Sequence, residues 1–205
     1  IKGAYYAKDV EQAETETRIS RVAHDRSADT FASWDLGIGD MMSIWVFQIV
    51  GKEWHWLRYY ENNGHGLDHY VDYIKALPFT VHNHFLPHDA EARELQTGKS
   101  RIEFLRGRGL NCTIVPRHEV DDGISAARTR FNRFWFDADG CKRGLDCLRM
   151  YRSEFDEKLQ VLKSRPLHDW ASHGADSFRY GVMGGNEKSP PAKDDWSKYR
   201  HGAYV

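Results

Sequence analysis

Apolar and polar residues alternate in short blocks along the first third of the chain. Three runs rich in aromatic and β-branched residues are separated by Gly-Asp and Gly-Lys, which are typical turn residues. Runs of this length and composition predict strands that pair as an antiparallel meander. The three expected strands cover 30–38, 43–50 and 53–60.

After residue 66 the apolar residues change to helical spacing, with short apolar runs in between. Leu67, Val71 and Ile74 lie on one helical face, and Pro78 follows as a stop. The same criteria predict helices at 67–77, 100–108, 123–137, 142–151 and 168–182, and strands at 80–86 and 112–115. This order of elements predicts an α/β protein with a ribonuclease H-like fold. We expect a mixed central sheet whose first three strands are antiparallel, flanked by helices.

Length and composition fit one folded domain. The chain has 205 residues, 40% of them hydrophobic, and seven tryptophans, which is enough for one large core. Because the first residue is Ile1 rather than methionine, we expect a piece of a longer protein. We interpret 1–25 as a linker or arm from a preceding domain, 26–183 as the folded domain, and 184–205 as a polar C-terminal tail.

Charge and cysteine content narrow the range of partners. The formal net charge is −1, so a polyanion would have to be met by a local patch or through bound cations. No apolar run approaches the roughly 18 residues that a membrane span needs, and we expect no membrane contact. Three cysteines without a Cys-x-x-Cys pair favour a reducing compartment over a disulfide framework.

Three aspartates lie near the ends of different predicted elements. Asp35 ends the apolar part of the first strand and shares its face with Phe31 and Ser33, Asp89 follows the fourth strand, and Asp176 lies in the last helix. Carboxylates that converge repel one another and are costly to bury, so their convergence makes sense if divalent cations neutralise them. Oxygen ligands alone favour Mg²⁺ or Mn²⁺ over zinc.

The motifs around these aspartates resemble a known family. They are GAYYAKD at 3–9, WDLGIGDMMSIWVF at 34–47, LPHDAEARE at 86–94 and HDWASHGADSFRYG at 168–181. Together they are similar to the C-terminal nuclease domain of the large terminase subunit of tailed bacteriophages. The resemblance implies an endonuclease that cuts concatemeric double-stranded viral DNA during genome packaging, with two Mg²⁺ or Mn²⁺ ions.

The resemblance also implies partners and a location. They are double-stranded DNA, an N-terminal ATPase domain of the same protein, the portal protein and the small terminase subunit, all in the cytoplasm of the bacterial host. The chain has no G-x-x-x-x-G-K-[ST] loop, so the ATPase would lie in the preceding part of the protein.

Two-metal hydrolysis needs a carboxylate that bridges the ions, and we assign that role to Asp35, with Asp89 and Asp176 completing the two sites. Asp169 precedes Asp176 by two helical turns and is the alternative third ligand, or a helix cap. Asp89 could instead cap a helix that begins at Ala90.

Three more residues near these motifs could support the ligands. Asp40 fits a turn residue or a group that hydrogen-bonds to a metal ligand. His168 and His173 could relay protons or belong to a helix-capping network.

A basic region could hold the DNA backbone. Its residues are Arg128, Arg130, Arg133, Lys142 and Arg143. The ordinary alternative is a solvated helix face. Two other functional classes stay open: a resolvase or transposase core with the same acidic trio, and a non-catalytic module that docks on DNA or the portal.

Overall fold

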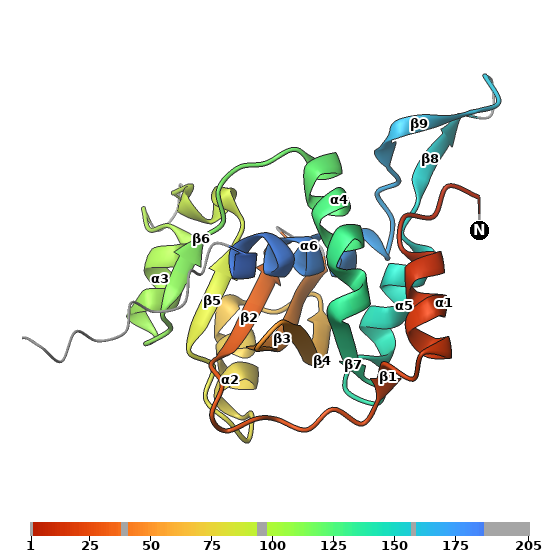
Figure 1. Ribbon diagram of the computed structural model, residues 1–205. Coiled ribbons are helices and arrows are strands. Elements are labelled where there is room, and N and C mark those ends of the chain that lie inside the picture. The colour runs from red at the N-terminus through yellow and green to blue at the C-terminus, as the bar shows by residue number, and fades with distance from the viewer. Residues whose placement is uncertain (1, 38–40, 94–97, 157–158, 187–205) are drawn as a thin grey trace, which may run out of the picture.

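The computed structural model describes residues 2–37, 41–93, 98–156 and 159–186, and these form a central sheet with helices on both faces (Figure 1). The sheet has seven strands in the order β1-β7-β4-β3-β2-β5-β6. Their bounds are β1 Ile19–Ser20, β2 Thr30–Asp35, β3 Met42–Val50, β4 Glu53–Asn62, β5 Asn83–Leu86, β6 Cys112–Ile114 and β7 Phe134–Asp137. The helices are α1 Ala7–Thr15, α2 Leu67–Lys75, α3 Arg101–Gly107, α4 Val120–Arg130, α5 Lys142–Met150 and α6 Ser172–Asn186.

The sheet is mixed, as expected for a ribonuclease H-like fold. Strands β2, β3 and β4 form the predicted antiparallel meander. Strand β5 pairs parallel to β2, β6 parallel to β5, β7 parallel to β4, and β1 parallel to β7. Only β3 runs against the others among these seven strands, so the carboxyl ends of β2, β4 and β5 point the same way.

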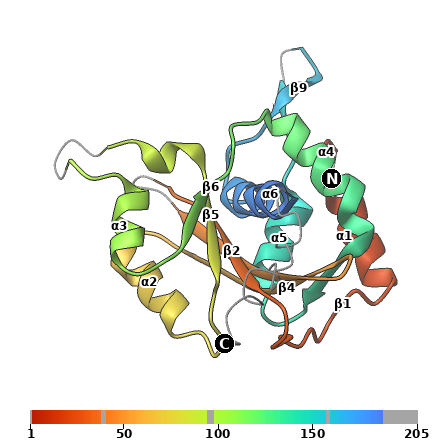
Figure 2. The same ribbon diagram turned by 60° about the vertical axis from the view of Figure 1, so that its left-hand side comes forward.

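Each face of the sheet has its own apolar core. Helices α1, α4, α5 and α6 cover one face, and α2 and α3 cover the other (Figures 1 and 2). In β2 the side chain of Phe31 belongs to the core under α6, whereas Ala32 and Trp34 belong to the core under α2 and α3. This alternation matches the one expected from the sequence.

Helix α6 lies close against the middle of the sheet because glycines face it. A Cβ atom on Gly181 would lie 2.6 Å from Ser33 Oγ, and one on Gly184 would lie 2.4 Å from the Phe85 ring. The backbone of α6 also accepts hydrogen bonds from the sheet: Trp45 Nε1 donates to the Gly174 carbonyl at 2.8 Å. The side chains of α6 are therefore held at fixed positions over β2 and β3.

The helix expected at 123–137 is wrong in its second half. Helix α4 ends at Arg130, a 3₁₀ helix spans Phe131–Arg133, and Phe134–Asp137 is strand β7. The chain extends here because β7 fills the place between β1 and β4, where Phe134 and Phe136 are fully buried. Such a tertiary position overrides the local helical spacing.

Two further segments differ from the sequence analysis. Within the segment 1–25, which we interpreted as a linker or arm, Ala7–Thr15 forms α1, and its Val10 and Ala13 are buried in the core. A second, two-stranded sheet, β8 Ser153–Asp156 paired with β9 Val161–Pro166, was not predicted. Of the tail expected at 184–205, the first three residues continue α6 and the rest lies outside the described residues. No helix in the described part of the chain is long and apolar enough to cross a membrane.

Candidate metal centre

The carboxylates expected to converge lie at the edge of the sheet where β2 and β5 end. Asp35 is the last residue of β2, and the parallel pairing of Ser33 with Phe85 places the end of β5 beside it. Asp89 follows β5 in a 3₁₀ helix, His88–Glu91, whose N-cap is Pro87. Asp89 therefore lies inside this short helix and does not cap it.

Asp35 is the most buried of these acids and is held by a histidine. Its side chain is 19% exposed, and its Oδ2 lies 2.9 Å from His173 Nδ1 on α6. Burial raises the pKa of the Asp35 carboxyl, the His173 hydrogen bond opposes this shift, and the negative charges of Asp176 and Asp89 raise the pKa further. Each of the other two carboxylates is thus close enough to repel the Asp35 anion.

Asp176 is positioned by a buried arginine one turn further along α6. Arg179 Nη2 donates to Asp176 Oδ1 at 2.9 Å, and Arg179 Nη1 lies 2.8 Å from His118 Nε2. Burial favours a neutral guanidine, but the Asp176 carboxylate outweighs it and raises the pKa of Arg179. This pairing fixes one oxygen of Asp176 and was not anticipated from the sequence.

Asp169 is not on one helical face with Asp176, because α6 begins only at Ser172. The Asp169 carboxylate instead accepts from the Ala171 amide at 2.9 Å and pairs with Arg152 at 3.2 Å. His168 Nδ1 lies 3.1 Å from Ser172 Oγ in the same turn. Asp40 lies outside the described residues.

The donor set fits a hard divalent cation. Asp35, Asp89 and Asp176 offer carboxylate oxygens, which Mg²⁺ and Mn²⁺ prefer, and a cation between them would relieve the repulsion that raises the pKa of Asp35. Within the described residues, no group of three or more His, Cys, Asp or Glu side chains is already arranged to hold a metal ion. Asp35 instead hydrogen-bonds to His173, and Asp176 pairs with Arg179.

The basic residues predicted to form one patch divide between two ends of the sheet. Arg130 and Arg133 lie just before β7, whose first residue pairs with Trp54 at the start of β4. Arg128 pairs with Asp9 at 3.6 Å. Asp35 lies at the opposite edge, so these arginines do not gather around it. Lys142 and Arg143 are exposed at the start of α5.

A fourth carboxylate lies in the same cross-strand row as Asp35. Asp35 pairs with Ser43, and Ser43 pairs with Glu61, so the three side chains share the face under α6. Glu61 was missed in the sequence, although the alternation along β4 places it on this face. It accepts from Arg143 Nε at 2.6 Å and from Tyr59 Oη at 2.5 Å.

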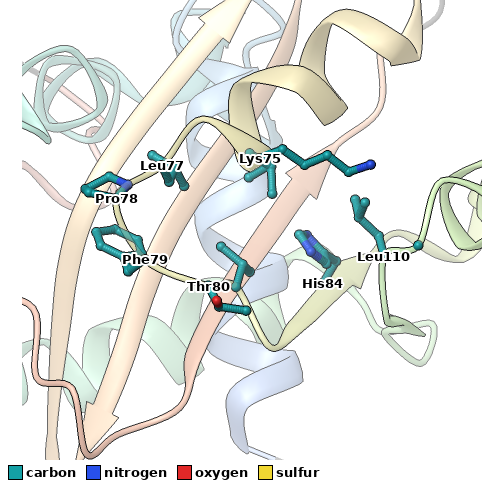
Figure 3. Close-up of a pocket in the computed structure, with 10 residues that line it drawn as sticks. Lys75, Leu77, Pro78, Phe79, Thr80, His84 and Leu110 are labelled. Carbon is teal, nitrogen blue, oxygen red and sulfur yellow. The ribbon is translucent and has the colours of Figure 1, made fainter.

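A pocket of about 410 Å³ lies away from these acids, between the end of α2 and the start of β5 (Figure 3). Leu77, Phe79, His84 and Leu110 line it. It opens on the face covered by α2 and α3, so it is separate from the carboxylate edge.

The described residues form an α/β domain with a ribonuclease H-like fold. No family model matches the sequence, and no curated protein matches it. Among solved structures, the large terminase of a thermophilic bacteriophage superposes with a TM-score of 0.68 at 18% identity, over 88% of this chain and 44% of that one. The chain therefore spans less than half the length of that large terminase.

Isolated nuclease domains superpose over most of both chains. The P22 large terminase nuclease domain gives a TM-score of 0.60 at 16% identity, over 83% of this chain and 89% of that one. The large terminase nuclease of the thermophilic phage G20c with bound magnesium gives 0.60 at 14% identity, over 89% and 97%. The chain has the fold of the phage large terminase nuclease domain.

Proposed function

We propose that this protein is a divalent-metal-dependent endonuclease that cuts double-stranded DNA during viral genome packaging. The observation that supports the proposal is the mostly buried Asp35 carboxylate at the end of β2, whose pKa is raised by burial and, to a smaller extent, by the negative charges of Asp176 on α6 and Asp89 after β5. A carboxylate that is mostly buried beside two like charges is destabilised in a metal-free protein. Such an arrangement is typical of a site that serves a cation and not of one that serves stability alone.

In this proposal Asp35, Asp89 and Asp176 hold two Mg²⁺ or Mn²⁺ ions. Bound metal ions would polarise the phosphate and lower the pKa of a water nucleophile. We assign Asp35 the role of the shared ligand, because the negative charges of both other carboxylates act on its own. His173 orients the Asp35 carboxylate through Nδ1, and Arg179 fixes one oxygen of Asp176.

The geometry favours Asp176 over Asp169 as the third ligand. Asp176 raises the pKa of Asp35 and therefore lies within its electrostatic reach. Asp169 is already engaged by the Ala171 amide and by Arg152. We assign Asp169 a structural role in the turn that precedes α6.

The link to packaging rests on the fold that this chain shares with terminase nuclease domains. In the proposal the DNA is a viral concatemer, and an ATPase domain elsewhere in the same protein delivers it to the carboxylate edge. The portal protein and the small terminase subunit are the further partners we propose, in the cytoplasm of a bacterial host.

Plasmid cleavage tests the proposed activity. Supercoiled DNA should be nicked and linearised in Mn²⁺ or Mg²⁺ and left intact in EDTA. Asp35→Asn should abolish cutting while circular dichroism shows a native fold. Asp29→Asn is a matched control, because the Asp29 side chain is 60% exposed just before the same strand. Cutting by Asp35→Asn at the wild-type rate would refute the proposal.

A further inference from the structure

Beside the carboxylate edge, an arginine and a tryptophan lie against each other at the surface. The guanidinium carbon of Arg143 lies 4.3 Å from the centroid of the Trp170 ring. Arg143 comes from the first turn of α5, and Trp170 from the turn that leads into α6. Two separate elements thus bring these side chains together.

Glu61 holds the Arg143 side chain in place through an ion pair. Its carboxylate is only 12% exposed and binds Arg143 Nε at 2.6 Å, whereas the Arg143 side chain stays 49% exposed. Because Nε faces Glu61, the two Nη groups form the outer edge of the guanidinium. Such a held guanidinium can donate two parallel hydrogen bonds to a phosphate.

Trp170 is unusual among the large apolar side chains of this protein. It is 40% exposed, and the other exposed large apolar residues of the described chain all belong to β8, β9 and their connection. An exposed indole beside a guanidinium offers a flat surface on which a sugar or a base can pack.

Arg143 and Trp170 lie near the Asp35 carboxylate. Glu61 lies two strands from Asp35 in the same cross-strand row, which corresponds to about 10 Å at the usual strand spacing. Trp170 precedes His173, the residue that binds Asp35, by less than one helical turn of sequence. Arg143 and Trp170 are therefore within reach of a DNA strand that has one phosphate at Asp35.

We propose that Arg143 and Trp170 form a subsite for the nucleotide that flanks the cleaved phosphate. Arg143 binds the backbone phosphate, and Trp170 packs on the deoxyribose or base of the same nucleotide. This inference rests on the proposed nuclease function and adds to it a tryptophan that carries part of the DNA affinity. The contact reads the backbone and a π-face, so it binds DNA without selecting a sequence.

Anisotropy of a labelled DNA duplex in EDTA, where no cutting occurs, tests the subsite. Arg143→Gln alone would leave the negative charge of Glu61 without its partner, and this charge would itself repel DNA. The informative variant is therefore the double substitution Glu61→Gln with Arg143→Gln, which leaves the net charge unchanged. If Arg143 only cancels Glu61, this variant binds DNA like the wild type. If Arg143 reaches a phosphate, affinity falls about tenfold and the slope of log affinity against log salt falls by about 0.9.

The control is an ion pair on the opposite face of the sheet. Arg108 pairs with Asp68 at 2.9 Å, and its side chain is 43% exposed, so Asp68→Asn with Arg108→Gln makes the same change in charge. This control should bind DNA like the wild type. Thermal melts of all variants show whether a loss of binding reflects a loss of fold.

Trp170→Ala should weaken binding about tenfold with an unchanged salt slope, and Trp170→Phe should keep most of the affinity. Wild-type affinity in both the neutral pair variant and Trp170→Ala would overturn the proposal. If Trp170→Ala binds DNA like the wild type but no longer binds the ATPase domain, the proposal is overturned, and Trp170 belongs to an interface between the two domains. If the binding losses occur but the wild type cuts no plasmid, the subsite stands and the nuclease proposal fails.

Discussion

Replacing His84 by glutamine should remove much of the acid sensitivity of the fold. His84 lies in β5 and is 1% exposed, and its Nδ1 accepts a hydrogen bond from Trp34 Nε1 at 3.1 Å. Burial lowers the pKa of His84 from 6.5 to about 4. A proton on Nδ1 would place two N–H groups against each other, so the native state resists protonation.

The sign and size follow from linkage. The unfolded chain takes up a proton as the pH falls through 6.5, whereas the native chain does so only near pH 4. The contribution of neutral His84 to the free energy of unfolding is therefore fully present above pH 6.5 and is lost as the pH falls toward 4. The whole effect corresponds to about 3 kcal/mol, and about 2 kcal/mol of it is lost by about pH 5.

Urea unfolding at neutral pH and near pH 5 measures this loss. The free energy of unfolding of the wild type should fall by about 2 kcal/mol more than that of His84→Gln. His82→Gln is the matched control, since its side chain is 47% exposed and should keep the wild-type acid sensitivity. Equal losses for the wild type and His84→Gln would refute the reasoning.

Three further predictions concern helix α6, the turn that precedes it and the proposed metal ions. Gly181→Ala should destabilise the fold by about 1–2 kcal/mol, because overpacking against Ser33 costs more than the gain in helix propensity returns. The same variant should slow DNA cleavage. Gly107→Ala is the control and should not destabilise the fold, since the space around Gly107 is open. Asp169→Ala should cost about 1 kcal/mol in urea unfolding, through the lost hydrogen bond from the Ala171 amide and the lost Arg152 pair, with cleavage retained. EDTA should abolish cleavage reversibly without changing the circular dichroism spectrum.

The elements that depend on local patterns could be predicted from the sequence. The alternation of Phe31, Ser33 and Asp35 with Ala32 and Trp34 placed Asp35 on the correct face of β2, because a strand buried on both sides still keeps a period of two. The meander of β2, β3 and β4 followed from its turns.

The elements that depend on distant partners could not be predicted. Phe131 and Phe134 have helical spacing, yet Phe134 starts strand β7 because this segment pairs between β1 and β4. The burial of α1 depends on its packing against α5, which lies 135 residues further along the chain.

The candidate site divides in the same way. Acids at the ends of elements could be recognised, whereas the pairing of Asp176 with Arg179 and of Glu61 with Arg143 depends on side-chain directions that only the folded chain defines. The beginning of α6 at Ser172 likewise separates Asp169 from Asp176 in a way that sequence spacing alone did not reveal.

The central claim is that three carboxylates hold divalent cations at the edge of β2. Titration of the protein with Mn²⁺, followed by electron paramagnetic resonance of the free ion, tests it directly and without DNA. The wild type and Asp169→Asn should bind Mn²⁺, and Asp35→Asn should lose this binding while remaining folded. Equal Mn²⁺ binding by the wild type and Asp35→Asn, or none by a folded wild type, would contradict the account.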